Sequence, residues 1–340
     1  MAKKNKFNLF QKLLYFINSI VATILLLSYF LAFVSPKTVP VFSVASLAVP
    51  FLIVLNLVFL IYWVIKLKKH FILSGIVLAF GWLFFPPFVK LSKKSIALNS
   101  DVKVMSYNVR MFNIYNWIEE KDIDQKIMTF INEKEPDILA LQEYYDSKDR
   151  KFDYPYSYFV PKSQKNNFGL AIFSKYKILN KGSLDFKKSA NNAIFIDILK
   201  GKDTVRVYNI HLQSLKLNPQ KENFGEANSE KLVDRLKTGF KKQASQVESF
   251  LAHEKNWKGK KVICGDFNNT AFSWVYRQIS KNKKDAFEVA GSGLGKTFNY
   301  FFPIRIDFIL TDEKTKIHSF TTFSEKLSDH FPVMSRINFE

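Results

Sequence analysis

The chain has 340 residues, enough for two structural units, and its formal net charge is +20. Its single cysteine, Cys264, excludes an internal disulfide bond. Residues 1–100 hold eleven lysines and no acidic residue, which leaves 39 basic against 30 acidic residues in the rest of the chain, a surplus of +9. The distribution of charge along the chain therefore excludes a uniformly basic protein and indicates two parts of different composition.

Three long uncharged stretches follow one another in the first part, at Leu13–Val34, Thr38–Ile65 and Phe71–Val89. Each is close to the roughly 20 apolar residues that a helix needs to cross a bilayer, and three in succession would be unusual in a soluble core. The third stretch is the shortest, and Pro86 and Pro87 shorten it further. The first is too long for a cleaved signal peptide and lacks a small-x-small cleavage site. We predict a transmembrane region at residues 1–95, with helices at about 13–34, 41–65 and 71–89; buried helices of a soluble domain are the alternative.

The lysines predict the orientation of this region, because cytoplasmic segments retain positive charge during insertion. With the N-terminus inside, seven lysines are cytoplasmic (3, 4, 6, 12, 66, 68 and 69) and four lie outside (37, 90, 93 and 94). Three crossings then place the rest of the chain outside the cytoplasm, in a multi-pass membrane protein. If the short third helix fails to cross, the rest of the chain returns to the cytosol.

Residues 96–340 are predicted to form a second, globular unit after a short tether. In chain order, strands are expected at 103–109, 138–141, 169–173, 193–199, 204–210, 261–264, 305–310 and 331–337, and amphipathic helices at 122–134 and 229–255. The two kinds of element alternate without strict βαβ repetition, which favours mixed sheets. The polar stretch Ser214–Ser229 is expected to be a solvated loop, or a lid over a site.

Polar residues end or interrupt the apolar strands at Asn108, Glu143, His211, the pair Asp266 and Asn268, Asp307, and the pair Asp329 and His330. Taken singly, each has an ordinary explanation as a turn residue, a solvated strand end or a structural histidine. Asp266 and Asn268 lie two residues apart, so they project to the same side if the chain stays extended. Asp307 interrupts an apolar run, where a buried carboxylate needs a partner, and His330 is the candidate.

Acids, amides and two histidines make up this set, without a serine or cysteine nucleophile. Hard oxygen ligands suit Mg²⁺ or Mn²⁺, whereas zinc would favour more histidine and cysteine. A hard metal, a water-activating aspartate and histidines that neutralise negative charge together indicate phosphoester hydrolysis.

Seven short motifs occur in a characteristic order: Ser106-Tyr107-Asn108, Leu141-Gln142-Glu143, Gly169–Ser174, Asn209-Ile210-His211-Leu212, Gly265-Asp266-Phe267-Asn268, Arg305–Leu310 and Ser328-Asp329-His330. Together they resemble the endonuclease/exonuclease/phosphatase superfamily, which has the deoxyribonuclease-I-like fold. The resemblance covers roughly residues 101–340. It implies a four-layer α/β sandwich, in which two packed mixed β-sheets are flanked by helices, and a Mg²⁺- or Mn²⁺-dependent phosphoester hydrolase.

The resemblance also implies a metal site. Glu143 would be the principal metal carboxylate and Asn108 would assist it. Asp329 would lie beside the metal or its water network.

The remaining residues would handle water and phosphate. Asp266 would orient or deprotonate the attacking water, and Asn268 would hold the scissile phosphate. His330, paired with Asp307, would stabilise the charge that develops on phosphorus, and His211 would be a second histidine in contact with the phosphate.

His211 favours deoxyribonuclease-like or sphingomyelinase-like members of the superfamily over abasic-site repair enzymes. This sequence departs from the family pattern near the same residue. In the deoxyribonuclease branch, a carboxylate just before the strand that corresponds to Gly169–Phe173 can support this histidine, whereas here the stretch is Lys165-Asn166-Asn167, without an acidic residue. Asn167 is the available substitute.

The sequence thus predicts a membrane-anchored phosphodiesterase. A nucleic-acid substrate fits the basic surplus, because phosphate backbones attract lysine and arginine. A lipid (sphingomyelinase-like) or inositol phosphate phosphodiesterase or phosphatase is the alternative enzyme, and a non-catalytic membrane interaction protein is the alternative of another class.

Overall fold

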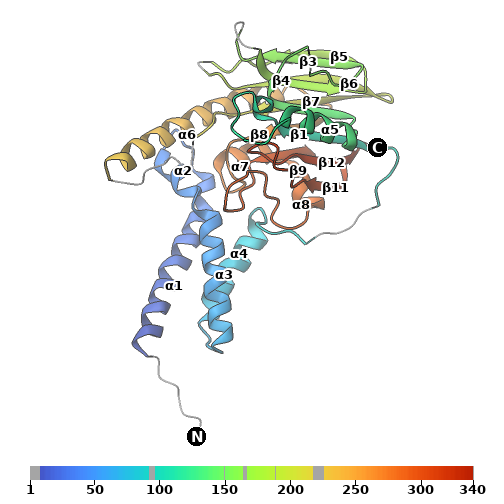
Figure 1. Cartoon of the computed structure of the whole chain (residues 1–340). Coiled ribbons are helices and arrows are strands. Elements are labelled where there is room, and N and C mark those ends of the chain that lie inside the picture. The colour runs from blue at the N-terminus through green and yellow to red at the C-terminus, as the bar shows by residue number, and fades with distance from the viewer. Residues whose placement is uncertain are drawn as a thin grey trace.

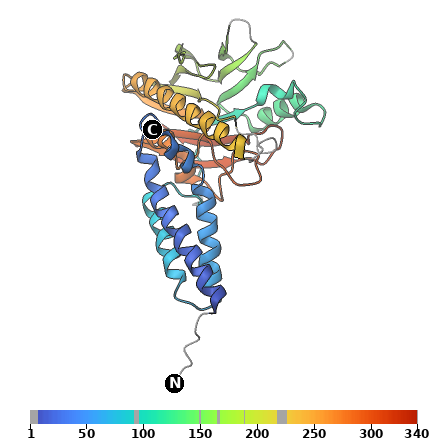
Figure 2. The same cartoon turned by 90° about the vertical axis from the view of Figure 1, so that its left-hand side faces the viewer.

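A slender bundle of N-terminal helices stands against a larger α/β body (Figures 1 and 2). The computed structural model describes residues 8–91, 96–148, 150–163, 167–187, 189–216 and 226–339. The bundle consists of α1 (Leu9–Ser28), the 3-10 helix η1 (Tyr29–Phe33), α2 (Pro40–Ser46), α3 (Val49–Ile65) and α4 (Phe71–Phe84). Helices α1, α3 and α4 run side by side, and the turn between α3 and α4 lies at the end far from the α/β body (Figure 1).

A buried chain of polar side chains joins these three helices. Asn18 of α1 donates from Nδ2 to Ser74 Oγ of α4 at 2.6 Å, and Ser74 donates to Asn56 Oδ1 of α3 at 3.1 Å. Trp63 of α3 donates its indole N–H to Asn18 Oδ1 at 3.0 Å. Because polar groups in an apolar interior require partners, this network fixes how the helices align.

The lengths of the observed helices do not support the expectation of three membrane-spanning helices. Within the described residues, only the continuous helix Leu9–Phe33 is long and apolar enough to cross a bilayer by itself. The second stretch is divided into α2 and α3, which meet at 45° and would count as a span only together. The 14-residue α4 rises about 21 Å, short of a hydrocarbon core of about 30 Å. Prolines explain both corrections, because Pro50 lies in the first turn of α3 and Pro86-Pro87 follow α4.

Two six-stranded mixed sheets form the α/β body. The first has the order β11-β12-β1-β2-β4-β3, and the second β5-β6-β7-β8-β10-β9. The strands of the first sheet are β1 (Val102–Asn108), β2 (Ile138–Tyr145), β3 (Tyr156–Pro161), β4 (Phe168–Ser174), β11 (Lys316–Thr322) and β12 (Val333–Asn338). Those of the second are β5 (Ile178–Ser183), β6 (Asn192–Lys200), β7 (Asp203–His211), β8 (Lys260–Asp266), β9 (Lys283–Asp285) and β10 (Asp307–Asp312). The pairs β1–β2 and β7–β8 are parallel, and the other neighbours are antiparallel.

The sheets pack face to face over an aliphatic core. Val104 and Ile172 of the first sheet and Ile196 and Val262 of the second are completely buried in it. The outer face of the first sheet is covered by α5 (Ile123–Lys134), which follows the 3-10 turn η2 (Arg110–Asn113). The second is covered by α6 (Glu226–Glu254) and α7 (Trp274–Ser280), while α8 (Ala286–Ala290) closes one side of the core. The two packed mixed sheets and their flanking helices confirm the predicted α/β architecture.

All eight predicted strands and both predicted helices are present, with ends shifted by a few residues. Four strands escaped prediction, namely β3, β5, β9 and β11, together with the short helices α7 and α8. Part of the expected loop at Ser214–Ser229 becomes the first turn of α6, and residues 217–225 of that loop lie outside the described residues.

Candidate active site

The predicted polar residues gather where the central strands of both sheets end. Asn108 ends β1 and Glu143 lies near the end of β2, while His211 and Asp266 end the parallel strands β7 and β8. Asp307 begins β10 directly opposite Asp266, because these two strands are antiparallel. Strand pairing within each sheet and the packing of the two sheets therefore bring together residues that are up to 199 positions apart in the sequence.

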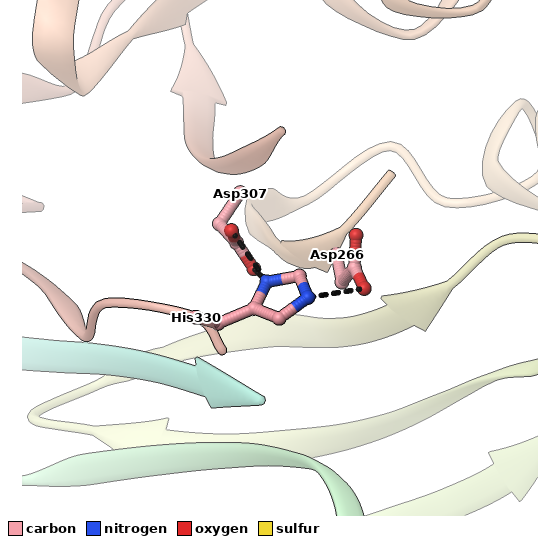
Figure 3. Close-up of side chains that lie close together, drawn as sticks. All are labelled: Asp266, Asp307 and His330. Carbon is pink, nitrogen blue, oxygen red and sulfur yellow. Dashed lines mark hydrogen bonds and ion pairs between the residues drawn. The ribbon is translucent and has the colours of Figure 1, made fainter. Parts of the chain in front are cut away.

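Asp266, His330 and Asp307 form a buried line of side chains (Figure 3). His330 Nδ1 lies 3.0 Å from Asp307 Oδ2, and Nε2 lies 3.6 Å from Asp266 Oδ2. Each of the three residues is 5% exposed or less. The predicted Asp307–His330 pair is thus present, and it leaves the Nε2 edge of the imidazole directed at Asp266.

Charges in this line perturb one another. Burial opposes protonation of His330, but the carboxylates of Asp307 and Asp266 outweigh it, so the pKa of His330 lies well above its usual value. Burial raises the pKa of Asp266 to about 7, although the charge of His330 acts in the opposite direction. The imidazole therefore keeps its proton at neutral pH, while Asp266 can accept a proton in the same range.

Two amides hold the Asp266 carboxylate from its other sides. Asn108 Nδ2 donates to Asp266 Oδ2 at 3.1 Å, and Asn268 donates to it from Nδ2 at 3.1 Å and from its backbone N–H to Oδ1 at 2.7 Å. Asn268 is not extended, as the sequence argument assumed, but has a φ of 50°. The turn is possible because Gly265 has a φ of 138°, and a Cβ there would lie 1.9 Å from the carbonyl oxygen of Ile210.

Glu143 and His211 complete the inner wall. His211 Nε2 lies 3.6 Å from Asp266 Oδ2 and 3.9 Å from Glu143 Oε1. Burial, followed by the charge of His330, lowers the pKa of His211 to about 3, so its ring is neutral at pH 7. Burial and the charge of Asp329 raise the pKa of Glu143. The stretch Lys165-Asn166-Asn167, the candidate for the orientation of His211, lies outside the described residues at positions 165 and 166. The contacts of the His211 ring with Asp266 and Glu143 are both long.

Asp329 lies at the rim and is tied to the first sheet. Its Oδ2 forms an ion pair with Arg110 Nε at 3.3 Å, and its Oδ1 accepts from Ser328 Oγ at 3.2 Å. The same Ser328 hydroxyl lies 2.8 Å from the carbonyl oxygen of Asn108. The rim is therefore connected to the end of β1, which carries Asn108.

The chemistry of the donors suits a divalent cation. Asp266, Asp307 and His330 offer ligand atoms within 4.8 Å of one another and form a candidate metal site. The proton on His330 competes with coordination there, because a protonated imidazole has no free lone pair. Glu143 lies at the edge of the same site, where its Oε1 accepts a long hydrogen bond of 3.5 Å from Asn108 Nδ2. A carboxylate beside the side-chain amide of an asparagine, which also carries an oxygen, suits a hard cation.

Three supporting residues were not predicted. Gln142 Nε2 donates to Asn209 Oδ1 at 2.7 Å, and Asn209 Nδ2 donates to the carbonyls of Leu141 and Ala171 at 2.9 and 3.0 Å. These completely buried amides connect the two sheets directly beneath the site. The sequence offered a signal for both, because Gln142 and Asn209 are amide residues within apolar strands and lie next to, or two positions from, a predicted site residue. Arg110 is the third, two positions after Asn108.

A cavity of about 400 Å³ opens over these groups. Seven of the eight predicted site residues line it, namely Asn108, Glu143, His211, Asp266, Asn268, Asp329 and His330. Asp307 stands behind His330. The arrangement offers a proton acceptor, a protonated imidazole and amide donors around one space, which is what attack of water on a phosphoester requires.

The profile of the Endonuclease/Exonuclease/phosphatase family matches residues 105–330, and that of a domain of unknown function (DUF8431) matches residues 11–88. No curated protein matches the chain. Among solved structures, the catalytic domain of human Nocturnin is 18% identical and covers 72% of this chain and 97% of its own, with a TM-score of 0.53. An endonuclease/exonuclease/phosphatase from Bacteroides vulgatus is 20% identical, with coverages of 71% and 99% and a TM-score of 0.52. A mannosyl-6-phosphatase from Bacteroides thetaiotaomicron is 19% identical, with coverages of 70% and 100% and a TM-score of 0.51. At these identities, the likeness is one of fold.

Proposed function

Because the chain belongs to the endonuclease/exonuclease/phosphatase family, we propose that it is a divalent-metal-dependent phosphoester hydrolase acting beside a membrane. The observation that carries the proposal is the convergence of Asn108, Asn268, His211 and His330 on the carboxylate of Asp266. The amides fix the position of this carboxylate, and burial raises its pKa to about 7, so that it can accept a proton from water.

Glu143 and Asn108 would hold the cation, with Asp329 at the edge of the same cavity. Their oxygen atoms favour Mg²⁺ or Mn²⁺ over softer metals. A divalent cation supplies positive charge that neutralises phosphoester oxygens and polarises the phosphorus centre.

The chain's own residues account for the other requirements of the reaction. Asp266 takes the proton as the water oxygen bonds to phosphorus and the ester P–O bond breaks, and the leaving oxygen departs with the bonding electrons and takes a proton from solvent. Asn268 and His211 would donate to the phosphate oxygens; Asn268 Nδ2 bonds to Asp266 Oδ2 and to the carbonyl oxygen of Leu212 in the structure and would exchange one of these bonds for the phosphate. His330, kept protonated by Asp307, has Nε2 3.6 Å from Asp266 Oδ2 and would offer Nε2–H to the charge that grows on the phosphate oxygens beside Asp266.

Membrane attachment is supported by the outer faces of the bundle. Exposed apolar side chains cover its three long helices, including Phe16 and Leu27 of α1, Val58 and Ile61 of α3, and Ile76 and Leu83 of α4. Such a surface suits hydrocarbon better than water. We propose that α1 spans the bilayer and that the bent pair α2–α3 and the shorter α4 are embedded with it.

The bundle also favours one orientation. The turn between α3 and α4 carries Lys66, Lys68 and Lys69 at the end far from the α/β body (Figure 1). Positive charge at that end favours the cytoplasmic side, so the catalytic part would lie outside the cytoplasm. A reporter fused after Glu340 that is active only in the cytosol would contradict this orientation.

Two substrate classes have support. The basic surplus after residue 100 favours a nucleic acid, and the apolar side of the catalytic cavity favours a lipid phosphoester. The test is a panel of DNA, RNA, sphingomyelin, inositol phosphates and bis(4-nitrophenyl) phosphate, offered to the full chain in detergent. We expect hydrolysis that EDTA abolishes, that Mg²⁺ or Mn²⁺ restores and that His330→Ala reduces strongly. Hydrolysis that survives both EDTA and His330→Ala would refute the proposal.

A further inference from the structure

The catalytic cavity has an apolar side that the N-terminal helices help to build. Besides the polar site residues, its lining includes Leu47, Phe51, Leu215, Phe298, Tyr300, Ile304 and Ile306. Leu47 and Phe51 belong to the junction of α2 and α3, far before the first site residue in the sequence. The bundle is thus part of the wall that faces the substrate, in addition to any role as an anchor.

Aromatic and aliphatic contacts hold this junction against the α/β body. The Phe51 ring stacks on Phe302 with centroids 3.9 Å apart and planes inclined by 21°. Leu47 packs with Leu215, Leu236 and Phe240, and α2 lies along α6 (Figure 1). A wall held on both sides has a defined position relative to the site.

A salt bridge and a cation–π contact strengthen the same attachment. Lys37, just before α2, pairs with Glu248 of α6. The Arg277 guanidinium of α7 lies 3.6 Å from the centroid of the Phe33 ring at the end of η1. These contacts keep the bundle from turning away from the cavity.

A second cavity lies on the other side of the same catalytic groups. It has a volume of about 320 Å³ and shares Glu143 and His211 with the first. Its polar lining includes Lys162, Asn191 and Asn192. A phosphate at Glu143 and His211 would therefore have an apolar space on one side and a more polar space on the other.

We infer that the preferred substrate is an amphiphilic phosphoester whose hydrocarbon chain lies against Leu47 and Phe51. This inference rests on the proposed hydrolase function and names its substrate class. The apolar wall combines four aliphatic with three aromatic side chains, a surface against which a flexible alkyl chain can pack. Phe51 is 39% exposed, and α3 continues from it with the exposed Leu55 and Val58, so the apolar surface is continuous from the bundle to the cavity.

This continuity distinguishes a lipid from a nucleic acid. A chain already dissolved in a bilayer could follow α3 to the site without crossing water, and each methylene it buries contributes about 0.8 kcal/mol. A polynucleotide gains nothing from aliphatic contacts and continues as a charged strand on both sides of each phosphate. The hydrocarbon is therefore the occupant that this wall favours.

The experiment uses alkyl 4-nitrophenyl phosphates with methyl, butyl and octyl chains, the full chain in detergent, and Mg²⁺. Release of nitrophenolate gives kcat/KM for each diester. We expect kcat/KM to rise with chain length, by about fourfold for each methylene that the wall buries. In Phe51→Ala the octyl-to-methyl ratio should fall at least tenfold, and in Phe51→Trp the preferred chain should become shorter. Phe42→Ala, on the neighbouring helix α2 and 40% exposed but outside the cavity lining, is the matched control and should keep the wild-type ratio.

The outcomes separate the two levels of the argument. Equal kcat/KM for the three diesters, or an unchanged ratio in both Phe51 variants, overturns the amphiphilic substrate and leaves the hydrolase intact. An oligonucleotide cleaved with higher kcat/KM than the octyl ester also overturns it. If none of these esters is hydrolysed, the proposed function falls and the inference falls with it.

Discussion

Replacing Asp307 by asparagine tests how the site controls the charge of His330. Asp307 Oδ2 lies 3.0 Å from His330 Nδ1. At an effective dielectric constant of about 20, the attraction of two unit charges at this separation is on the order of 5 kcal/mol. If burial of the pair cancels about half, some 2.7 kcal/mol remains, or about two pKa units. The asparagine keeps the shape of the side chain but removes its charge, so the pKa of His330 should fall.

We expect kcat to fall by up to about 100-fold on the alkaline side of the pH profile, where a pKa lower by about two units leaves His330 neutral, and KM to change little. The rate depends on protonated His330, and its raised pKa keeps the imidazole protonated as pH increases. Because Asp307→Asn lowers this pKa, the alkaline loss of activity should begin at a lower pH. The assay is kcat against pH with bis(4-nitrophenyl) phosphate and saturating Mg²⁺, with thermal unfolding to confirm that the variant is folded. A folded variant with kcat within twofold of wild type and the same alkaline limb would refute the reasoning.

Three further predictions concern the metal, the turn and the core. Glu143→Gln should raise the Mg²⁺ concentration needed for half-maximal activity by about 100-fold, and an unchanged activation curve would remove Glu143 from the metal site. Gly265→Ala should lower the free energy of unfolding by more than about 3 kcal/mol in chemical denaturation, because its Cβ would meet the backbone of Ile210; a smaller loss would show that the turn can adapt. Burial raises the pKa of Cys264 to about 12, so native protein should resist iodoacetamide at pH 8 and react once unfolded, and rapid native labelling would contradict the buried position.

The central strands could be predicted because both of their faces are buried. In β1, β7 and β8 the apolar residues run almost without interruption, so any polar residue at the end is conspicuous. The four strands that escaped prediction are the edge strands of the two sheets, and three of them, β3, β5 and β11, carry exposed polar residues. Exposed positions dominate the middle of β5, and β9 has three residues, which is too short for any periodicity to appear.

The sequence could predict which residues gather at the candidate site, but not how their side chains are arranged. Strand ends and the motif order identified all eight residues, and the structure brings them into one group. The left-handed turn at Asn268 and the bridge from Gln142 to Asn209 depend on the close approach of β7 and β8 and of the two sheets, which no local pattern encodes. The roles of the eight residues remain predictions for mutagenesis.

The helical N-terminus shows the limit of hydropathy. Uninterrupted apolar composition predicted three helices in the right places, but composition does not register where a helix ends. Pro50 and the Pro86-Pro87 pair divide or shorten the second and third stretches. The approach of Leu47 and Phe51 to the catalytic cavity depends on tertiary packing between the two parts of the chain.

The most direct test of the central claim is hydrolysis of bis(4-nitrophenyl) phosphate by the full chain and by Asp266→Asn, each with and without Mg²⁺. If Asp266 accepts the proton of the attacking water, the wild type should be active only with the metal, and the variant should lose activity by about 10²–10⁴-fold while still folding. Wild-type hydrolysis that does not need the metal, or equal rates for the two proteins, would contradict the account.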